Sequence, residues 1–587
     1  MKRSNLTRTT PLLIFGLGMG LVSTCWGQTE KLSIDLQGRG VPADLDVIIQ
    51  YKQSPSSTDH SKVISKGGTH RGTFSSIRAG LYRVPASAIA ELAKDPNVAY
   101  ISPDRPLHAN LDQAQATIGA SAAATYGLTG SGVGVVVMDS GVGYSEDLAG
   151  KVVYEHVFLP NTPEGDNFGH GSHVAGIIAG SGALSTTNPY TTFTRTFHGV
   201  AEGVNLLDFQ VLNSSGVGSD SAVIAALEQA VAFKKAGQYN IRVINLSLGR
   251  PVYESYKLDP LCQAVEQAWN AGIVVVAAAG NYGRMGPTTT YGYGTIAAPG
   301  NDPLVITVGA MKDMGTTTLT DDMIATYSSK GPTLYDLVAK PDLVAPGNLI
   351  DSVQAQSNYL FGTYHSQIGI AQNLFANTAN NGASNDYMQL SGTSMATPYV
   401  SAAAALILQQ HPTLTPDQVK ARLMLTAEKT TFPTTSSYTD PSTHIVYKAQ
   451  YDIFTVGAGY LNIAGALGST AVAPTAASAA SPALVFTSAG TLQFVGGSNV
   501  VWGSNVVWGS NVVWGSNVVW GSNVVWGSNV VWGSSNLFLN AANVVWGSNV
   551  VWGSNVVWGS NVVWGSTSLS SQSSDTATSV LLNGDVY

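Results

Sequence analysis

Short apolar runs recur along the middle of the chain, and they do not alternate with polar residues. Four such runs begin at Gly134, Val243, Ile273 and Leu304, and each is rich in β-branched residues. Apolar positions without alternation are typical of strands that are covered on both faces, as in a parallel sheet. The pattern therefore predicts a buried, mostly parallel sheet in this part of the chain.

Helical patterns separate these apolar runs. The stretches Asp220 to Gly237 and Leu261 to Gly272 carry apolar residues at helical spacing, and each closes at a glycine, a common helix stop. Strands that alternate with helices predict an α/β fold with a doubly wound sheet. Ligands of such folds bind at the loops that follow the strands. We expect this domain to span residues 111–469.

A smaller unit precedes this domain, in residues 28–110. Within it, Asp46 to Tyr51 and Asn97 to Ser102 have the composition of strands, and Pro85 to Lys94 has that of a helix with proline at its first position. The unit is therefore predicted to be a small α+β domain.

The end of the chain has a different character. Residues 470–497 are rich in Ala, Ser and Pro and are predicted to be a linker. Residues 498–566 repeat the hexapeptide Asn-Val-Val-Trp-Gly-Ser, with one interruption at Ser535 to Ala542. The even period keeps each position on one side of an extended chain, which allows a β-solenoid; a disordered low-complexity segment is the alternative. Residues 567–587 are Ser/Thr-rich and are expected to be loose.

The first residues predict export from the cell. Lys2, Arg3 and Arg8 flank the apolar stretch Pro11 to Ser23, which predicts a signal peptide in residues 1–27. A membrane anchor is the alternative, but the stretch is shorter than the ~18–20 residues that a span needs. A lipoprotein box at Cys25 is a poor match. The protein is therefore expected to be secreted or extracellular.

Charge and cysteine content exclude other classes. Charged residues make up 11% of the chain, the formal net charge is -8, and no basic cluster occurs, which argues against a nucleic-acid partner. If Cys25 leaves with the signal peptide, Cys262 is the only remaining thiol, so an intramolecular disulfide is excluded.

Three short segments carry candidate chemistry. Asp139 ends an apolar run and enters a Ser-Gly turn, His170 lies between glycines in GHGSHVAG, and Ser394 lies in LSGTSMATP before an apolar helix at Tyr399 to Gln410. A serine at a helix N-terminus has backbone N–H groups and the positive dipole end beside it, which suits a developing oxyanion. Each residue also has a structural alternative. Asp139 and Ser394 could be caps, and His170 with His173 could bind metal, although no HExxH pattern accompanies them.

Taken together, the segments resemble the subtilisin-like serine peptidases, or subtilases. The order Asp139, His170, Ser394, with Val274 to Asn281 (VVVAAAGN) between, matches that family, and the SGTSMATP segment is highly specific to it. The resemblance implies a secreted serine endopeptidase in which Ser394 is the nucleophile, His170 the general base and Asp139 its orienting carboxylate. It also implies that Asn281 donates to the oxyanion and that the chemistry requires no cofactor. By the same match, His173 is not the base and packs or hydrogen-bonds nearby.

The resemblance extends to the substrate pocket and to the N-terminal unit. One pocket wall is expected at Ser247, Leu248 and Gly249, the other at Ala278, Ala279 and Gly280, with Ala297 near the floor. These residues are small and uncharged, so apolar P1 side chains are expected to be preferred over Lys or Arg. Residues Tyr82 to Arg105 resemble the subtilase propeptide, which implies an inhibitor removed by self-cleavage near residues 107–115. A retained accessory domain is the alternative.

Two segments depart from the family pattern. The loop Ser181 to Phe197 does not reproduce the family's calcium-binding loop, so a structural calcium ion is left open without a location. A long insertion between Gly347 and Ser391 is expected near the rim of the active site or as a tolerated surface loop; it carries Tyr359, Phe361, Tyr364, His365 and Tyr387.

The repeats add a second hypothesis about function. Residues 499–566 contain no charged residue, and every repeat carries a Trp, so little opposes pairing at strand edges. Cell-surface attachment or self-association of the repeats is therefore open beside the peptidase activity. A non-catalytic surface adhesin on a subtilase scaffold is the competing function. Protein or peptide substrates are the expected partners, but the natural substrate and the oligomeric state cannot be predicted.

Overall fold

The computed structural model describes most of the chain between residues 44 and 485. The described residues are 31–33, 36, 44–104, 106–109, 115, 117–186, 192–284, 292–355, 357–440, 444–475, 478–486, 492–494, six short strands between 511 and 552, and 574–585. The predicted signal peptide, residues 1–27, lies outside them. Within the described residues, no helix has the length and apolar character needed to cross a membrane.

The centre of the molecule is an eight-stranded sheet in the order β14-β13-β12-β10-β6-β8-β7, with β15 also paired to β13. All its described pairings are parallel except that of β13 with β14. The first of these strands in the sequence, β6, lies inside the sheet, and later strands extend it on both sides, which is the doubly wound arrangement predicted from the sequence. The bounds are β6 Gly134–Asp139, β7 Val152–Val157, β8 Asn205–Gln210, β10 Ile241–Leu246, β12 Val274–Ala278, β13 Ile306–Lys312, β14 Met323–Ile324 and β15 Leu343–Pro346.

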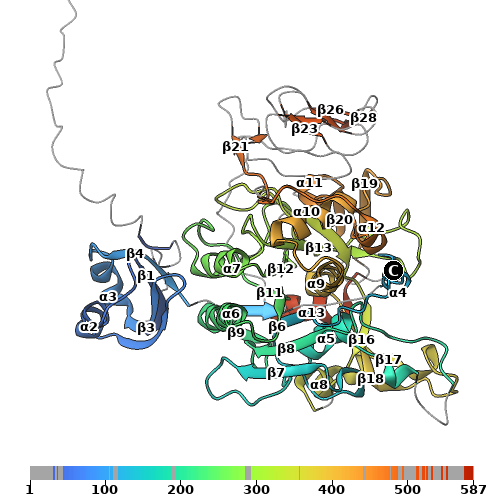
Figure 1. Ribbon diagram of the computed structural model, residues 1–587, viewed down its shortest axis with the longest axis horizontal. Helices are drawn as coiled ribbons and strands as arrows, with labels where there is room; N and C mark the ends of the chain where they lie inside the picture. The colour runs from blue at the N-terminus through green and yellow to red at the C-terminus, as the bar shows by residue number, and fades with distance from the viewer. Residues whose placement is uncertain are drawn as a thin grey trace, which may run out of the picture.

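Helices cover both faces of this sheet. Figure 1 shows α6 and α7 on one side of it and α5 and α9 on the other. The four predicted apolar runs all contribute to its buried strands, where the helices on both faces keep their side chains away from water. The helices are α4 Ala122–Thr125, α5 His170–Ala179, α6 Asp220–Lys235, α7 Pro260–Asn270, α9 Thr393–Gln410, α10 Pro416–Thr426, α11 Ile453–Val456 and α12 Ile463–Gly468.

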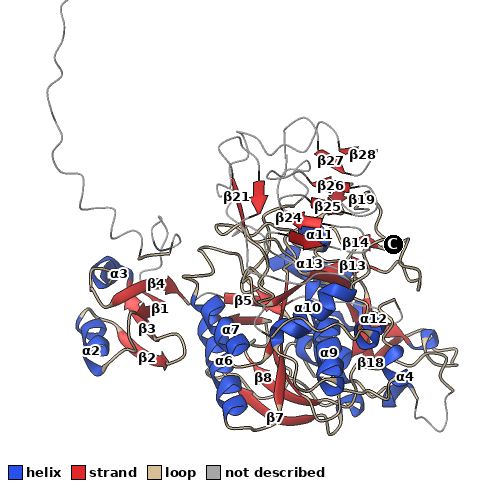
Figure 2. Cartoon of the chain, turned by 45° about the horizontal axis from the view of Figure 1, so that its top comes forward, coloured by secondary structure: helices blue, strands red, loops and turns tan. Residues whose placement is uncertain are grey.

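The N-terminal unit has its own sheet and core. Its four antiparallel strands have the order β2-β3-β1-β4, and Figures 1 and 2 both show the unit beside α6 and α7. The two predicted strands are confirmed. The predicted helix begins one residue later, because Pro85 is its N-cap and not its first residue. The elements are β1 Asp44–Tyr51, α2 Ser57–Ser65, β2 Thr69–Phe74, β3 Ala79–Pro85, α3 Ala86–Leu92 and β4 Val98–Pro103.

The insertion between Gly347 and Ser391 forms a second layer on the α5 side. Its strands β16, β17 and β18 make a small antiparallel sheet, and α8 precedes β17. Tyr387 is fully buried, with its hydroxyl bonded to Asp147 and Ser185, so the expectation that it lies near the rim is wrong for this residue. The bounds are β16 Ile350–Val353, α8 Tyr359–Ile368, β17 Gly369–Ala371 and β18 Ala383–Leu390; a separate hairpin pairs β19 Thr435–Thr439 with β20 Val446–Gln450.

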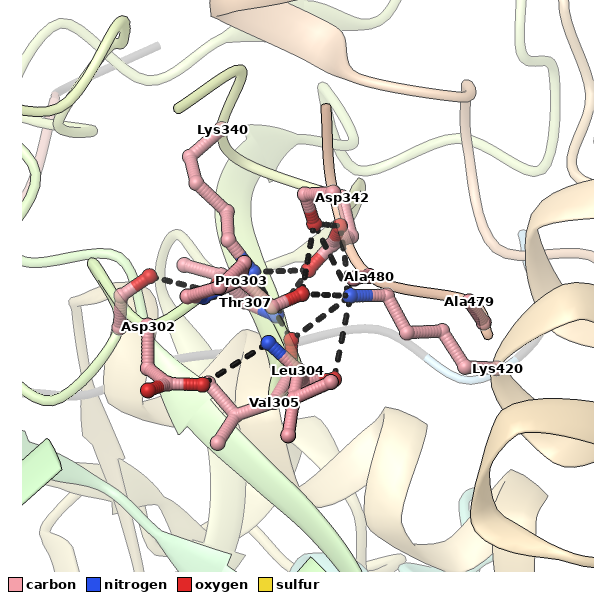
Figure 3. Close-up of polar contacts among 12 residues, drawn as sticks. Asp302, Pro303, Leu304, Val305, Thr307, Lys340, Asp342, Lys420, Ala479 and Ala480 are labelled. Carbon is pink, nitrogen blue, oxygen red and sulfur yellow. Dashed lines mark hydrogen bonds and ion pairs between the residues drawn. The ribbon is translucent and has the colours of Figure 1, made fainter. Parts of the chain in front are cut away.

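Part of the stretch predicted as a linker packs into the core. Lys420 lies wholly buried on α10, and its ammonium group donates to the carbonyl oxygens of Pro303 and Val305 and to the Ser481 hydroxyl, at 2.9, 3.0 and 2.9 Å. Asp342 pairs with this ammonium group and with that of Lys340 (Figure 3). Ser481 therefore anchors the linker stretch to the sheet, a role that its Ala/Ser/Pro composition does not reveal.

The described parts of the repeat region pair in antiparallel fashion. Strands β23 to β26 lie side by side in sequence order, and β27 pairs with β28 in the same manner. A β-solenoid would place successive coils in parallel, so that prediction is wrong for these strands. The Gly-Ser-Asn sequence between copies has turn chemistry that suits this antiparallel pairing. The strands of the repeats are β23 Asn511–Val513, β24 Val519–Gly521, β25 Val524–Trp526, β26 Val530–Trp532, β27 Val544–Trp546 and β28 Val550–Trp552. Before them, within the predicted linker, β21 Leu484–Phe486 pairs antiparallel with β22 Leu492–Phe494.

The last part of the chain is ordered against the main body. Helix α13 spans Ser574–Asn583, and the side chains of Val580, Leu581 and Asp585 are at most 3% exposed. The prediction of a loose segment is therefore wrong for residues 574–585. A run of three apolar residues, Val580 to Leu582, in an otherwise Ser/Thr-rich sequence is too weak a signal to predict this packing.

Candidate active site

The parallel sheet brings Asp139, Ser247 and Asn281 to one edge, because β6 ends at Asp139 and the other two residues follow the ends of β10 and β12. Asp139 is the last residue of β6, and His170 is the first residue of α5. The His170 Nδ1 atom lies 2.6 Å from Asp139 Oδ1, and both side chains are fully buried. A buried carboxylate held this close fixes the tautomer and the orientation of the imidazole ring.

The helix that begins beside His170 starts earlier than its apolar pattern suggests. The run VAGIIAG predicts a start at Val174, but α5 begins at His170. Its N-cap, Gly169, has a φ of 111°, a left-handed conformation that glycine adopts at little cost. The Gly-His-Gly sequence is thus the turn that places His170 in the first helical position.

Ser394 lies in the first turn of α9, which begins at Thr393 and not at Tyr399. Pro398 has no N–H to donate to the carbonyl oxygen of Ser394, four residues earlier in the helix. The Ser247 hydroxyl donates to that oxygen instead, at 2.6 Å, and thereby holds the turn that carries Ser394. The Ser394 side chain is 3% exposed.

Asn281 follows β12 and faces the same turn. Its Oδ1 atom accepts hydrogen bonds from Thr393 N at 2.9 Å and from Thr393 Oγ1 at 3.0 Å. These bonds fix the amide orientation and aim Nδ2 away from Thr393. Nδ2 is buried and has no hydrogen-bond partner within the part of the chain that the structure describes. A buried donor without a partner lowers the stability of the fold, so its presence indicates that Nδ2 serves to bind a ligand atom.

Asp166 organises the turns of Asp139 and His170, and the sequence analysis missed it. Its Oδ1 atom accepts from Ser140 Oγ at 2.8 Å and from Gly169 N at 2.6 Å, and its Oδ2 atom accepts from Ser172 N and Oγ. Burial raises the pKa of Asp166, although these hydrogen bonds oppose the shift. Its position three residues before the Gly-His-Gly turn is the signal that could have suggested a helix-capping carboxylate.

His173 has a different role from His170. Its Nε2 atom lies 3.0 Å from the Ile350 carbonyl oxygen and 3.2 Å from that of Met388. Burial lowers the pKa of His173 to about 3, so the ring is neutral and donates from Nε2. The expectation that His173 only packs and hydrogen-bonds nearby is confirmed. No group of His, Cys, Asp and Glu side chains suited to a metal ion occurs among the described residues, and the structure gives no location for calcium.

The predicted pocket walls converge on Ala297. Ser247, Leu248 and Gly249 leave the end of β10, where Leu248–Gly249 form β11, while Ala278, Ala279 and Gly280 leave the end of β12. A Cβ atom on Gly249 would lie 3.1 Å from Ala297 Cβ, and one on Gly280 would lie 2.8 Å from it. Side chains larger than hydrogen at these two positions would therefore fill the space between the walls.

The insertion reaches the segment just before His170. At the start of α8, Tyr359 N donates to the Asn167 carbonyl oxygen and Leu360 N to that of Phe168, each at 3.0 Å. The rings of Tyr359 and Phe168 are stacked, with centroids 6.0 Å apart. The first turn of α8 therefore lies beside the segment that leads to His170, as expected for an insertion near the active site.

Comparison with known proteins gives a consistent result. Residues 130–447 match the family model described as the subtilase family. The chain is 35% identical to serine protease AprX of Bacillus subtilis (strain 168) over 65% of its own length and 82% of that protein. It is 36% identical to subtilisin E of the same strain (65% and 84%), and 34% identical to the extracellular serine proteinase of Thermus sp. (strain Rt41A) (59% and 70%).

A solved structure supports the fold. Fervidolysin from Fervidobacterium pennivorans, described as a keratinolytic enzyme related to subtilisin, superposes with a TM-score of 0.53. The match covers 76% of this chain and 63% of that one, at 19% sequence identity. At this identity the likeness concerns the arrangement of helices and strands and not the substrate.

Proposed function

The chain belongs to the subtilase family and is a subtilisin-like serine endopeptidase, and from that premise we propose that Ser394, His170, Asp139 and Asn281 perform the hydrolysis. The observation that carries the proposal is the fully buried pair of His170 and Asp139, joined at 2.6 Å at the sheet edge where the turns of Ser394 and Asn281 also lie. The proposed chemistry uses only side chains, backbone groups and water, so it requires no cofactor.

The pairing of His170 defines its part in the reaction. Because Nδ1 faces Asp139 and donates to it, Nε2 is the ring atom that can accept a proton. His170 removes the proton from the Ser394 hydroxyl as the oxygen attacks the peptide carbonyl carbon, and then gives that proton to the departing amine. Water, activated in the same way, hydrolyses the resulting acyl-enzyme ester.

Asn281 stabilises the negative charge that develops on the carbonyl oxygen during the attack. Its Nδ2 atom is the buried donor without a partner, and Thr393 holds the other side of the amide. A donor fixed before the reaction loses no energy to reorganisation when the oxyanion forms. The positive end of the α9 dipole adds to this stabilisation at Ser394.

We further propose that residues 28–110 are an inhibitory propeptide that the enzyme removes itself. Strand β5, Pro106–Ala109, lies between β9, Val217–Ser219, and β11, Leu248–Gly249. Its antiparallel register pairs Ala109 with Leu248, the neighbour of the residue that bonds the Ser394 turn. A segment bound this way occupies the strands that would bind substrate. We therefore expect cleavage between Asn110 and Leu111.

Contacts of the N-terminal unit support an inhibitor that binds tightly. Tyr100 donates to Glu254 at 2.6 Å in a buried position, and Ser76 donates twice to Glu228 on α6. Asp104 accepts from Ser221 N at 2.6 Å in the first turn of α6. The unit keeps a core of its own, and four of its apolar residues also join the core of the main domain, so the interface combines polar bonds with apolar packing: Ile48, Phe74, Ile77 and Ala79.

The enzyme is proposed to act outside the cell, in keeping with the N-terminal sequence and with the extracellular proteinase among its relatives. Surface attachment or self-association through the repeats stays a prediction. An active-site phosphonate probe tests the proposal: the processed protein should be labelled, and Ser394→Ala should not. N-terminal sequencing of the secreted protein should begin at Leu111. Absence of labelling on correctly processed protein would contradict the proposed chemistry.

A further inference from the structure

The C-terminal segment, residues 574–585, is built into the main body of the molecule. Val580 and Leu581 belong to the same hydrophobic core as the central sheet, although about ninety residues separate them from the last strand anchored there. Asp585 is fully buried. A charged side chain is seldom buried without partners, so the contacts of Asp585 identify the residues that hold this segment.

Three residues from three different turns hold Asp585. Arg284 Nη2 lies 2.6 Å from Asp585 Oδ1, and Thr326 N donates to Asp585 Oδ2 at 2.8 Å. Asn348 bonds the backbone of Asp585 in both directions, since its Nδ2 atom donates to the carbonyl oxygen and its Oδ1 atom accepts from the N–H. The carboxylate and the backbone are both satisfied, as in a specific peptide-binding site.

The same segment supports the turn that carries the nucleophile. Three successive backbone amides precede Ser394, and each donates to a different element at 2.9 Å. Ser391 N donates to the Leu581 carbonyl oxygen, Gly392 N to that of Gly347, and Thr393 N to Asn281 Oδ1. The C-terminal segment thus supplies one of the three supports of this turn.

The turn that carries the oxyanion donor is tied to the segment as well. Arg284 lies three residues after Asn281, and besides Asp585 it bonds the Gly584 carbonyl oxygen at 3.2 Å. The fit is close, because a Cβ atom on Gly584 would lie 2.2 Å from Ser391 Oγ and 2.6 Å from Asn348 Oδ1. Gly584 also has a φ of 55°, which a side chain would oppose.

We propose that Arg284, Thr326, Asn348 and Ser391 form a docking site for the chain's own C-terminal segment, and that docking positions the turns of Ser394 and Asn281 for catalysis. Asp585 and Arg284 are positioning residues in this account, which rests on the proposed function. Because residues 478–484 are also anchored to the body, the repeats lie between two attachment points and are not a free tail.

The test uses mature enzyme that ends at residue 573 and a synthetic peptide of residues 574–587. Misplacement of catalytic groups lowers kcat rather than substrate affinity. The truncated enzyme should therefore lose about tenfold to a hundredfold in kcat on a peptide p-nitroanilide, with KM changed by less than about twofold. Added peptide should restore kcat in a saturable manner, and the same peptide with Asp585→Asn should not. Far-UV circular dichroism checks that the truncated enzyme is folded.

Full-length variants carry the test if the truncated enzyme does not fold. Asp585→Asn removes the ion pair but keeps the shape, Gly584→Ala blocks the close fit, and the exposed Ser579→Ala is the matched control. The first two should lower kcat and the control should not. Wild-type kcat in the folded truncated enzyme, or in both Asp585→Asn and Gly584→Ala, overturns the proposal. Ser394→Ala distinguishes the two claims, because activity in that variant would contradict the proposed function itself.

Discussion

Two buried polar clusters lie at the central sheet, and they differ in how completely their hydrogen bonds are formed. In the lysine cluster of Lys340, Asp342 and Lys420, every ammonium and carboxylate group has partners, including backbone carbonyl oxygens. In the active-site cluster of Asp139, His170, Asn281 and Ser394, the Nδ2 atom of Asn281 has none among the described residues. The first cluster is closed, and the second keeps a donor for substrate.

The difference separates a stabilising role from a catalytic one. A buried network with all groups satisfied holds elements together, whereas an unsatisfied buried donor lowers stability and is kept where it binds something else. Asp342 shows how the lysine cluster satisfies its charged groups. Burial alone would raise the pKa of Asp342, but the ammonium groups of Lys340 and Lys420 outweigh burial and lower it. Substitutions in the two clusters should therefore affect different quantities.

The largest effect is expected for the active-site pair. His170→Ala removes the proposed general base, so kcat should fall by roughly 10⁴- to 10⁶-fold. The free energy of unfolding should fall by about 1–3 kcal/mol as well, because the buried Asp139 carboxylate loses its partner. Steady-state kinetics and thermal unfolding measure the two quantities. A large loss of stability with normal kcat would reverse the roles given to the two clusters.

Lys420→Met should show the opposite behaviour. It removes one ammonium group from a fully buried network and leaves several carbonyl oxygens without a donor. The free energy of unfolding should fall by about 3–5 kcal/mol, while kcat of the folded enzyme stays unchanged. Denaturant unfolding in the Ser394→Ala background avoids self-digestion. The exposed Lys235→Met is the matched control and should be neutral.

Asn281→Ala sharpens the comparison within the active site. Removal of one oxyanion donor should lower kcat by about 10²- to 10³-fold, with KM nearly unchanged. Because the Nδ2 donor is unsatisfied in the free enzyme, its loss should cost little stability. The substitution also removes the hydrogen bonds that Asn281 accepts from Thr393, and this loss lowers stability slightly. Unchanged kcat would show that Asn281 does not bind the oxyanion.

The smallest effect is expected at Asp208 on β8, a neighbour of both Asp139 and Asp166. Burial raises the pKa of Asp208 to about 8, with those carboxylates adding to the shift. The native state then holds a proton that the unfolded state loses above about pH 4, so this contribution to stability is lost as the pH rises from 4 to 8. Asp208→Asn keeps the acceptor for Val142 N.

Thermal unfolding of Asp208→Asn across that pH range checks this linkage. Relative to the parent, the variant should gain about 2 °C or more in Tm between pH 5 and pH 8, both in the Ser394→Ala background. A constant difference between the two proteins would show that Asp208 does not titrate in this range.

The sequence predicted the sheet and the close pairing of His170 with Asp139, because both depend on local patterns. Buried β-branched runs specify strands, and the glycines beside His170 and Ser394 specify the turns that position them. The helix starts at His170 and Thr393 were missed, since polar first turns break the apolar pattern. Asp166 was missed because its partners come from two separate turns.

The C-terminal third was predicted less well for a physical reason. Ser481 and Asp585 are held by Lys420 and Arg284, residues far away in the sequence, and neither lies in a periodic apolar segment. Composition alone indicates a linker and a loose end there. The repeats gave the strand pattern, but the pairing direction depends on the turn between copies, which an even period does not determine.

The central claim is that Ser394 forms an acyl-enzyme, and trapping that species tests it most directly. The mature enzyme would be mixed with a p-nitrophenyl ester of a short apolar acyl peptide, quenched with acid within the first turnover, and then digested for peptide mass mapping. The account predicts that the acyl mass is found on the peptide that contains Ser394, and that it is absent in Ser394→Ala. An acyl group on another residue, with Ser394 unmodified, would contradict it.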